Sequence, residues 1–141
     1  MDLARMVGGW SKDRSRGVGA VIVGPYREIR SVGYNGFPRG VNDVLDERHA
    51  RPAKYKWTEH AERNAIYNAA RTGMPLQGCE IYIPWYPCMD CARAIVQSGI
   101  VLMVAQEPDW DDPKWKDDFA LVGTLLSEGG VTVRFVDEPK C

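Results

Sequence analysis

The sequence predicts an α/β fold in three layers, with a five-stranded mixed sheet that carries helices on both faces. Short runs rich in Val and Ile, typical of buried strands, alternate with segments whose apolar residues recur at helical spacing. Such alternation predicts crossover connections, with the later strands parallel. Hydrophobic residues make up 45% of the 141 residues, and no repeat or long linker divides them, so we expect one domain over residues 1–141.

The first third of the chain predicts a short helix followed by a hairpin. Residues 3–7 are expected to belong to a leading helix. Residues 18–23 form a β-branched run that ends at Gly24-Pro25, as expected of a buried strand. Residues 29–34 form a second run of this kind, and the short connection between the two favours a hairpin.

The middle of the chain is expected to leave the sheet and to return in a helix. Turn-forming residues fill positions 35–40, which predicts a loop. Residues 43–56 are polar without a clear period and are expected to pass over the surface. From Thr58, a suitable N-cap, alanines recur at helical spacing until Gly73 stops the run.

The second half alternates strand and helix. Pro87 directly precedes one predicted helix, as helix starts favour, and glycines follow both helices. The predicted elements are a strand at 80–84, a helix at 88–97, a strand at 100–105, a helix at 117–127 and a strand at 131–136.

Charge and hydropathy exclude two broad classes of protein. Eighteen basic and nineteen acidic residues give a formal net charge of −1, which argues against a protein that mainly coats nucleic acid. No stretch approaches the roughly 20 apolar residues of a membrane-spanning helix, so no membrane partner is expected. The N-terminus lacks the pattern of a secretory signal, which predicts a cytoplasmic location.

Two of the four cysteines have metal-binding spacing. Cys88 and Cys91 form a Cys-x-x-Cys at a predicted helix start, where the sulfurs share one face and the helix dipole favours thiolates. Alone, this pair also suits a redox site or half of a structural zinc site. Cys79 is expected to be a small core residue, and Cys141 has no partner at a metal-binding spacing.

His60 and Glu62 complete the pattern of a catalytic zinc site. His60-Ala61-Glu62 opens the alanine-rich helix, whose N-terminus is expected at the same sheet edge as that of the helix at Cys88. His60, Cys88 and Cys91 would supply three ligands to one Zn²⁺ ion and leave a position for water, with Glu62 as the acid/base. The order H-x-E, then P-C-x-x-C, is the signature of zinc deaminases whose glutamate is not a ligand.

The resemblance extends beyond this signature. The chain is similar to the deoxycytidylate (dCMP) deaminases of the zinc-dependent cytidine deaminase superfamily over about residues 3–105. The matching blocks are Ser11-Lys12-Asp13, residues 18–23, residues 33–40, residues 60–66, residues 87–92 and residues 97–100. The resemblance implies a cytidine-deaminase-like fold and hydrolysis of dCMP to dUMP and ammonia. It also implies a homo-oligomer, commonly a hexamer in the family, with dCTP and dTTP as effectors.

The resemblance further implies roles for individual residues. Glu62 would move a proton from water to N3 of the base and then one to the departing amine. Asn35 matches an asparagine that binds the base or sugar of the substrate, although Tyr-Asn-Gly also favours a turn with positive φ.

Contacts to the phosphate and the base are less clearly indicated. A nucleotide monophosphate needs cationic partners, and basic residues flank the segments expected to border the pocket. The candidates are Lys12, Arg14, Arg16 and Arg39, each of which could equally be a solvated surface charge. Trp85 and Tyr86 precede the cysteine motif and could stack on the base or pack in the core. His49 is expected at the surface.

Two other functions stay open. A deaminase of a free base, a nucleoside or a tRNA adenosine would use the same zinc site, although the near-neutral charge weighs against tRNA. A noncatalytic zinc domain that binds nucleotide as a sensor would keep the fold but would have no use for Glu62.

Overall fold

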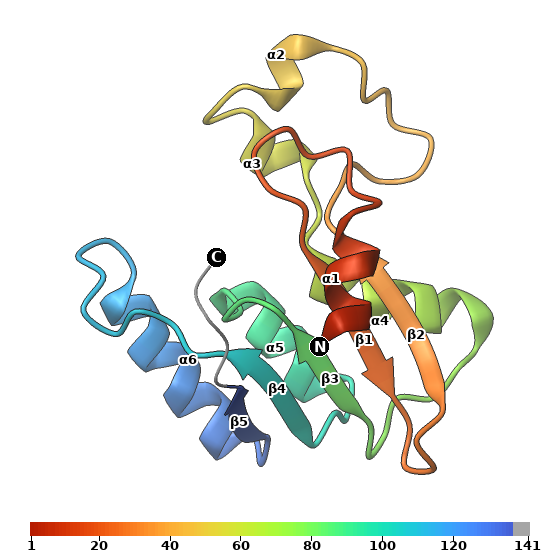
Figure 1. Cartoon of the computed structure of the whole chain (residues 1–141), viewed down its shortest axis with the longest axis vertical. Coiled ribbons are helices and arrows are strands. Elements are labelled where there is room, and N and C mark those ends of the chain that lie inside the picture. The colour runs from red at the N-terminus through yellow and green to blue at the C-terminus, as the bar shows by residue number, and fades with distance from the viewer. Residues whose placement is uncertain (137–141) are drawn as a thin grey trace.

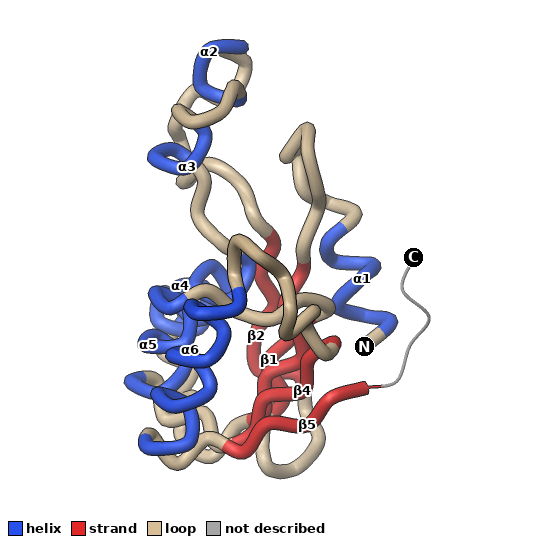
Figure 2. The backbone as a smooth tube through the Cα atoms, turned by 90° about the vertical axis from the view of Figure 1, so that its left-hand side faces the viewer, coloured by secondary structure: helices blue, strands red, loops and turns tan. Residues whose placement is uncertain are grey.

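The computed structural model describes residues 1–136 and shows a five-stranded mixed sheet between two layers of helices, which confirms the predicted three-layer fold (Figures 1 and 2). Cys141 lies outside the described residues. The elements are α1 (Asp2–Gly8), β1 (Gly19–Val23), β2 (Ile29–Tyr34), α2 (Asp46–His49), α3 (Lys54–Trp57), α4 (Ala61–Thr72), β3 (Glu80–Ile83), α5 (Met89–Gln97), β4 (Leu102–Gln106), α6 (Lys116–Glu128) and β5 (Thr132–Val136).

The strand order, β2-β1-β3-β4-β5, brings two helix starts to one edge of the sheet. Strand β1 is antiparallel to both β2 and β3, so β2 and β3 run in the same direction. Strands β3, β4 and β5 are parallel. Helix α4 is the next long helix after β2, and α5 follows β3 directly. The N-termini of α4 and α5 therefore lie at the edge where β2 and β3 end.

The two faces of the sheet are covered unequally. Figure 2 shows α4, α5 and α6 along one face and α1 alone on the other. The larger core lies under the three helices and contains fully buried side chains from strands and helices alike, including Ile22, Ile81, Ile83, Ile95, Met103 and Leu126. A smaller cluster joins Ala4 and Val7 of α1 to Val21 of β1. Burial of each large aliphatic side chain contributes about 1.5–3 kcal/mol, which holds the helices on the sheet.

Helix α4 approaches strand β2 more closely than a side chain would allow. A Cβ atom at Gly33 would lie 2.2 Å from the backbone nitrogen of Ala65 and 2.5 Å from the carbonyl oxygen of Ala61. The Ser31 hydroxyl donates a hydrogen bond of 2.7 Å to the Ala65 carbonyl in the same contact. The absence of a side chain at position 33 thus sets the height of α4 above the sheet.

Two asparagines of α4 cover the outer edge of β2. Asn68 Nδ2 donates to the carbonyl of Val32 at 2.7 Å, and Asn64 Nδ2 donates to that of Tyr34 at 2.8 Å. Unpaired carbonyls on an edge strand invite pairing with another chain. These side chains satisfy two of them and fix α4 along the strand.

The segment at 43–56 leaves the sheet as predicted, but it contains two helical turns that the sequence analysis did not predict. Helices α2 and α3 project beyond the end of the sheet, beside the loop that precedes β1 (Figure 1). Each has four residues, none of them buried. Neither helix therefore shows in the sequence the apolar stripe by which a helix is predicted.

The predicted N-cap at Thr58 is wrong. Thr58 follows α3, and α4 begins after His60, which has an extended backbone and makes no side-chain cap bond. The cause is a two-way backbone pairing, because Glu59 N donates to Gly36 O at 2.8 Å and Gly36 N donates to Glu59 O at 3.0 Å. This pairing keeps the chain extended up to His60. The predicted end of the helix at Gly73 is confirmed by its φ of 68°.

Within residues 1–136, every helix is too short or too polar to cross a membrane.

Replacement of Gly33 by Ala should destabilise the protein by about 1–3 kcal/mol, because the new methyl group must push α4 away from β2. Urea denaturation would measure the free energy of unfolding. Gly36→Ala is the matched control, since a Cβ atom there meets nothing within 4 Å, and we expect a change within about 0.5 kcal/mol. Equal stability of the two variants would show that the close approach does not hold α4.

Candidate metal centre and active site

Three side chains that are distant in sequence meet at the edge where β2 and β3 end. His60 Nδ1 lies 3.5 Å from Cys88 Sγ and 3.5 Å from Cys91 Sγ. All three ligand atoms lie within 4.8 Å of one another. Tetrahedral zinc, with bonds of about 2.3 Å to sulfur and 2.0 Å to nitrogen, would separate its ligands by about 3.5 Å. The donor set and its spacing therefore fit one zinc ion with a fourth position open.

The helix starts place these ligands. His60 is the residue before α4 and Cys88 the residue before α5, and both have extended backbones. Cys91 lies in the first turn of α5 and is fully buried. The positive ends of the two helix dipoles thus point toward the sulfurs, which favours their negative charge.

The two thiols have pKa values shifted in opposite directions. A hydrogen bond with Cys91 is the main reason that the pKa of Cys88 is lowered to about 4, against the effect of burial. The same hydrogen bond, together with burial, raises the pKa of Cys91. The hydrogen bond to Cys88 also raises the pKa of His60.

Glu62 lies in the first turn of α4 and is only 5% exposed. Burial raises the pKa of this carboxyl, while the charge of His60 and a hydrogen bond with Cys91 act in the opposite direction. A buried carboxyl beside a metal-ligand group, yet outside the three-ligand set, is placed to accept and release a proton.

An ion-pair network that the sequence analysis did not predict borders the ligands. Arg63 Nε donates to Glu59 Oε1 at 2.5 Å, and Arg63 Nη1 lies 3.3 Å from Asp90 Oδ2. Burial would lower the pKa of Arg63, but the charge of Cys91 and the bond to Glu59 raise it. The spacing of Glu59 and Arg63 was a local signal, whereas the partner on α5 could be found only in the fold.

Asn35 is buried and already bonded to the backbone. Its Oδ1 accepts a hydrogen bond from Val18 N at 2.7 Å, and its Nδ2 donates to Arg16 O at 2.9 Å. The alternative of a turn with positive φ is wrong, because Arg27 is the only non-glycine residue among positions 1–136 with such a φ. An amide has two N–H groups and two lone pairs on its oxygen. One N–H group and one oxygen lone pair of Asn35 take part in neither of these hydrogen bonds.

The four candidate phosphate ligands lie in different surroundings. Lys12 pairs with Asp43 at 2.8 Å, Arg14 pairs with Asp46 at 2.7 Å, and Arg39 donates to Asn68 Oδ1 at 2.7 Å. Asn68 is two turns, about 12 Å, along α4 from His60. Arg39 is therefore directed along the helix and not toward the three ligands.

Arg16 is the candidate that lies against the cysteine segment. Its guanidinium carbon is 4.2 Å from the ring centroid of Trp85, which is 50% exposed. Tyr86 is instead a core residue at 4% exposed, in edge contact with Phe119 and Trp110. Of the two aromatic candidates, only Trp85 offers a ring face at the surface.

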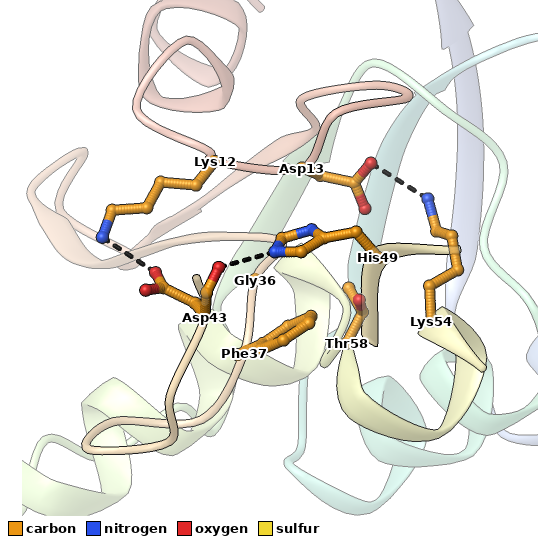
Figure 3. Close-up of a pocket in the computed structure, with 8 residues that line it drawn as sticks. All are labelled: Lys12, Asp13, Gly36, Phe37, Asp43, His49, Lys54 and Thr58. Atoms are coloured by element: carbon orange, nitrogen blue, oxygen red, sulfur yellow. Dashed lines mark hydrogen bonds and ion pairs between the residues drawn. The ribbon is translucent and has the colours of Figure 1, made fainter. Parts of the chain in front are cut away.

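A small pocket between the loop before β1, the loop after β2 and residues 43–58 is lined by charges that neutralise one another (Figure 3). Lys12 faces Asp43, and Lys54 lies 2.9 Å from Asp13. His49, expected at the surface, is half-buried. Its ring stacks on that of Phe37 with 4.8 Å between the centroids, and its Nε2 lies 2.6 Å from the Asp43 carbonyl oxygen. These contacts form because residues 43–56 fold back over the loop after β2.

Comparison with known proteins agrees with this geometry. The family described as the cytidine and deoxycytidylate deaminase zinc-binding region matches residues 1–107. A protein of Aliivibrio fischeri named as an uncharacterized deaminase in the luxG 3′ region is 41% identical over 135 residues, which cover 95% of this chain and 88% of that protein. Human deoxycytidylate deaminase is 37% identical over 137 residues, with 93% of this chain and 73% of that protein covered.

A solved structure is similar over nearly the whole chain. The dCMP deaminase of the cyanophage S-TIM5, in complex with dCMP and dUMP, superposes with a TM-score of 0.76 at 25% sequence identity. The match covers 96% of this chain and 92% of the phage protein.

The Asp13–Lys54 pair should stabilise the surface segment at residues 43–56 in a pH-dependent way. The side chains are only 6% and 12% exposed, so Asp13→Asn, which leaves Lys54 without its partner, should cost about 3 kcal/mol near neutral pH. Burial would raise the pKa of Asp13, but hydrogen bonds from Lys54 and from backbone N–H groups lower it overall. Its contribution is therefore complete above the unfolded-state pKa of about 3.9 and is lost as the pH falls through the lower folded-state value.

Urea denaturation at about pH 7 and about pH 3 would measure this contribution. The difference in unfolding free energy between the wild type and Asp13→Asn should shrink at the lower pH. Asp46→Asn is the control, since that carboxylate is 84% exposed in its pair with Arg14 and should matter little at either pH. A difference that stays constant with pH would contradict the assigned role of Asp13.

Proposed function

Because this chain belongs to the family of cytidine and deoxycytidylate deaminases, we propose that it hydrolyses dCMP to dUMP and ammonia. The observation that carries the proposal is the meeting of His60 Nδ1 with the two cysteine sulfurs, beside the buried carboxyl of Glu62. The similar phage enzyme binds dCMP and dUMP, which supports a nucleotide monophosphate as the substrate.

One zinc ion would be held by His60, Cys88 and Cys91, and when bound it supplies the Lewis acidity that makes a water molecule acidic near neutral pH. The Glu62 carboxylate accepts a proton from the water whose oxygen attacks C4, and it delivers that proton to N3 of the base. It then carries the second water proton to the exocyclic nitrogen. The bond between C4 and this nitrogen breaks, ammonia leaves and the C4 carbonyl forms.

Groups around the site would orient the substrate. The donor and acceptor of Asn35 that the backbone leaves available would contact the base or the sugar. The exposed face of Trp85 would stack on the base, and Arg16, which lies on that ring, would move to the phosphate. Lys12 and Arg39 are less suited, since they are engaged with Asp43 and Asn68.

Location, assembly and regulation belong to the same proposal. A cytoplasmic homo-oligomer, with dCTP and dTTP as effectors, follows from the resemblance described above. An exposed aromatic pair supports assembly, because Trp10 and Tyr34 are 56% and 41% exposed and in edge contact. Aromatic residues are enriched at interfaces between subunits.

A substrate panel tests the proposed reaction. We expect ammonia release from dCMP in preference to dCTP, deoxycytidine, cytosine, guanine and a tRNA anticodon stem-loop. The panel would be repeated with dCTP and dTTP, and sedimentation of the same samples would report assembly.

Arg16→Ala should raise KM for dCMP about tenfold and leave turnover of deoxycytidine unchanged, since the phosphate contact alone is lost.

If only an unphosphorylated compound is turned over, zinc-dependent deamination is supported, but the proposed contact of Arg16 with the phosphate is refuted. Zinc-loaded protein that turns over no member of the panel would favour the noncatalytic nucleotide sensor.

Replacement of Glu62 by Gln should lower kcat by about a thousandfold while zinc stays bound, because the amide cannot carry the proton. Cys88→Ala should instead lose the zinc, which atomic absorption would measure. Glu128→Gln is the matched control, since Glu128 is an exposed residue at the end of α6. A Glu62→Gln variant with wild-type kcat would exclude this residue as the proton carrier.

A further inference from the structure

We propose that Arg63 is a positioning residue that ties the helix start carrying His60 to the helix start carrying the two cysteines, and that this tie slows the release of zinc. The inference rests on the zinc site of the proposed function but not on the identity of the substrate. It concerns a side chain that the proposed reaction does not use.

The guanidinium of Arg63 spans two helices. Arg63 belongs to α4, one turn after His60, and is 19% exposed. Its Nε donates to Glu59 Oε1 at 2.5 Å on its own side. Its Nη1 lies 3.3 Å from Asp90 Oδ2, and Asp90 lies in α5 between the two ligand cysteines. A planar guanidinium with five N–H groups suits such a bridge, because it can serve two carboxylates at once.

The Glu59 end of the bridge is anchored to the sheet. The backbone of Glu59 pairs in both directions with Gly36, which follows β2. Its Oε1 also accepts a hydrogen bond of 3.1 Å from the backbone nitrogen of His60. One carboxylate oxygen therefore orients both the ligand residue and Arg63, and Arg63 extends this anchor to α5.

The arrangement matters for zinc because no single element holds the ion. One ligand directly precedes α4, and the other two lie at the start of α5, so relative motion of the helix starts would open the site. Groups that orient metal ligands through hydrogen bonds typically change metal affinity by about 10–100-fold when removed. The positive charge of Arg63 also lies near sulfurs that bind zinc as thiolates.

Arg93 provides a matched comparison within the same cluster. It pairs with Asp90 from one turn away on α5 itself and is 57% exposed. Arg93 therefore carries the same charge to the same carboxylate without connecting the two helices. Loss of Arg93 should leave the metal centre unchanged.

The test measures zinc release from the folded, zinc-loaded protein to an excess of a chromogenic chelator. We expect Arg63→Gln to release zinc about 10–100 times faster than the wild type, Arg63→Lys to lie between them, and Arg93→Gln to match the wild type within about twofold. Asp90→Asn should accelerate release several-fold, and adding it to Arg63→Gln should have little further effect, because the bridge is already broken.

Several outcomes would overturn the proposal. Wild-type release from Arg63→Gln, or equal acceleration by Arg93→Gln, would show that the bridge does not hold the centre. A loss of unfolding free energy in Arg63→Gln with unchanged zinc release would assign Arg63 a structural role only. If Arg63→Gln does not fold, Asp90→Asn decides, since Asp90 is 60% exposed and its replacement keeps the Glu59 contact. Failure of the substrate panel on zinc-loaded wild type would refute dCMP deamination and leave this test intact.

Discussion

The imidazole ligand lies at the start of α4 and both sulfur ligands at the start of α5, so the metal centre exists only while these helix starts stay in contact, with 3.5 Å between nitrogen and each sulfur. The sheet imposes this meeting, because β2 and β3 run in the same direction and end at one edge. The height of α4 then depends on the missing side chain at Gly33. A site of three side chains thus depends on a backbone contact in the first turns of α4.

The same convergence creates an electrostatic conflict. The two cysteines proposed to bind zinc as thiolates lie beside the buried carboxyl of Glu62, and negative charges at close range in a buried site repel. Two helix N-termini and the guanidinium of Arg63 supply positive potential from the protein. A bound zinc ion would supply the rest. These positive groups favour the charged form of the buried Glu62 carboxyl, as its proposed role as a proton carrier requires.

Local patterns in the sequence were sufficient to predict the nine larger elements of residues 1–136, because most of them combine an apolar run or period with a glycine or proline close to their end. They also indicated that His60, Cys88 and Cys91 would meet. They failed where a distant contact decides the local conformation. The cap at Thr58 was wrong because Gly36 pairs with Glu59, and the stacking of His49 on Phe37 joins residues twelve positions apart. The partner of Arg63 lies on another helix, beyond the range of spacing rules.

The residues proposed for the reaction lie at helix starts, whereas those proposed to bind the substrate lie mostly on loops. This difference explains why the sequence indicates the reaction better than it indicates the substrate. The proposed zinc ligands and Glu62 lie at helix starts whose positions the buried core sets. Arg16 and Trp85 lie on connecting segments, and their contact is a cation stacked on an exposed ring, which can rearrange at little cost. Asn35 joins the two systems, since its side chain holds the backbone at Arg16 and Val18 while retaining one donor and one acceptor. A change at Asn35 would therefore alter substrate contact and loop position together, whereas a change at Arg16 can alter the phosphate contact alone.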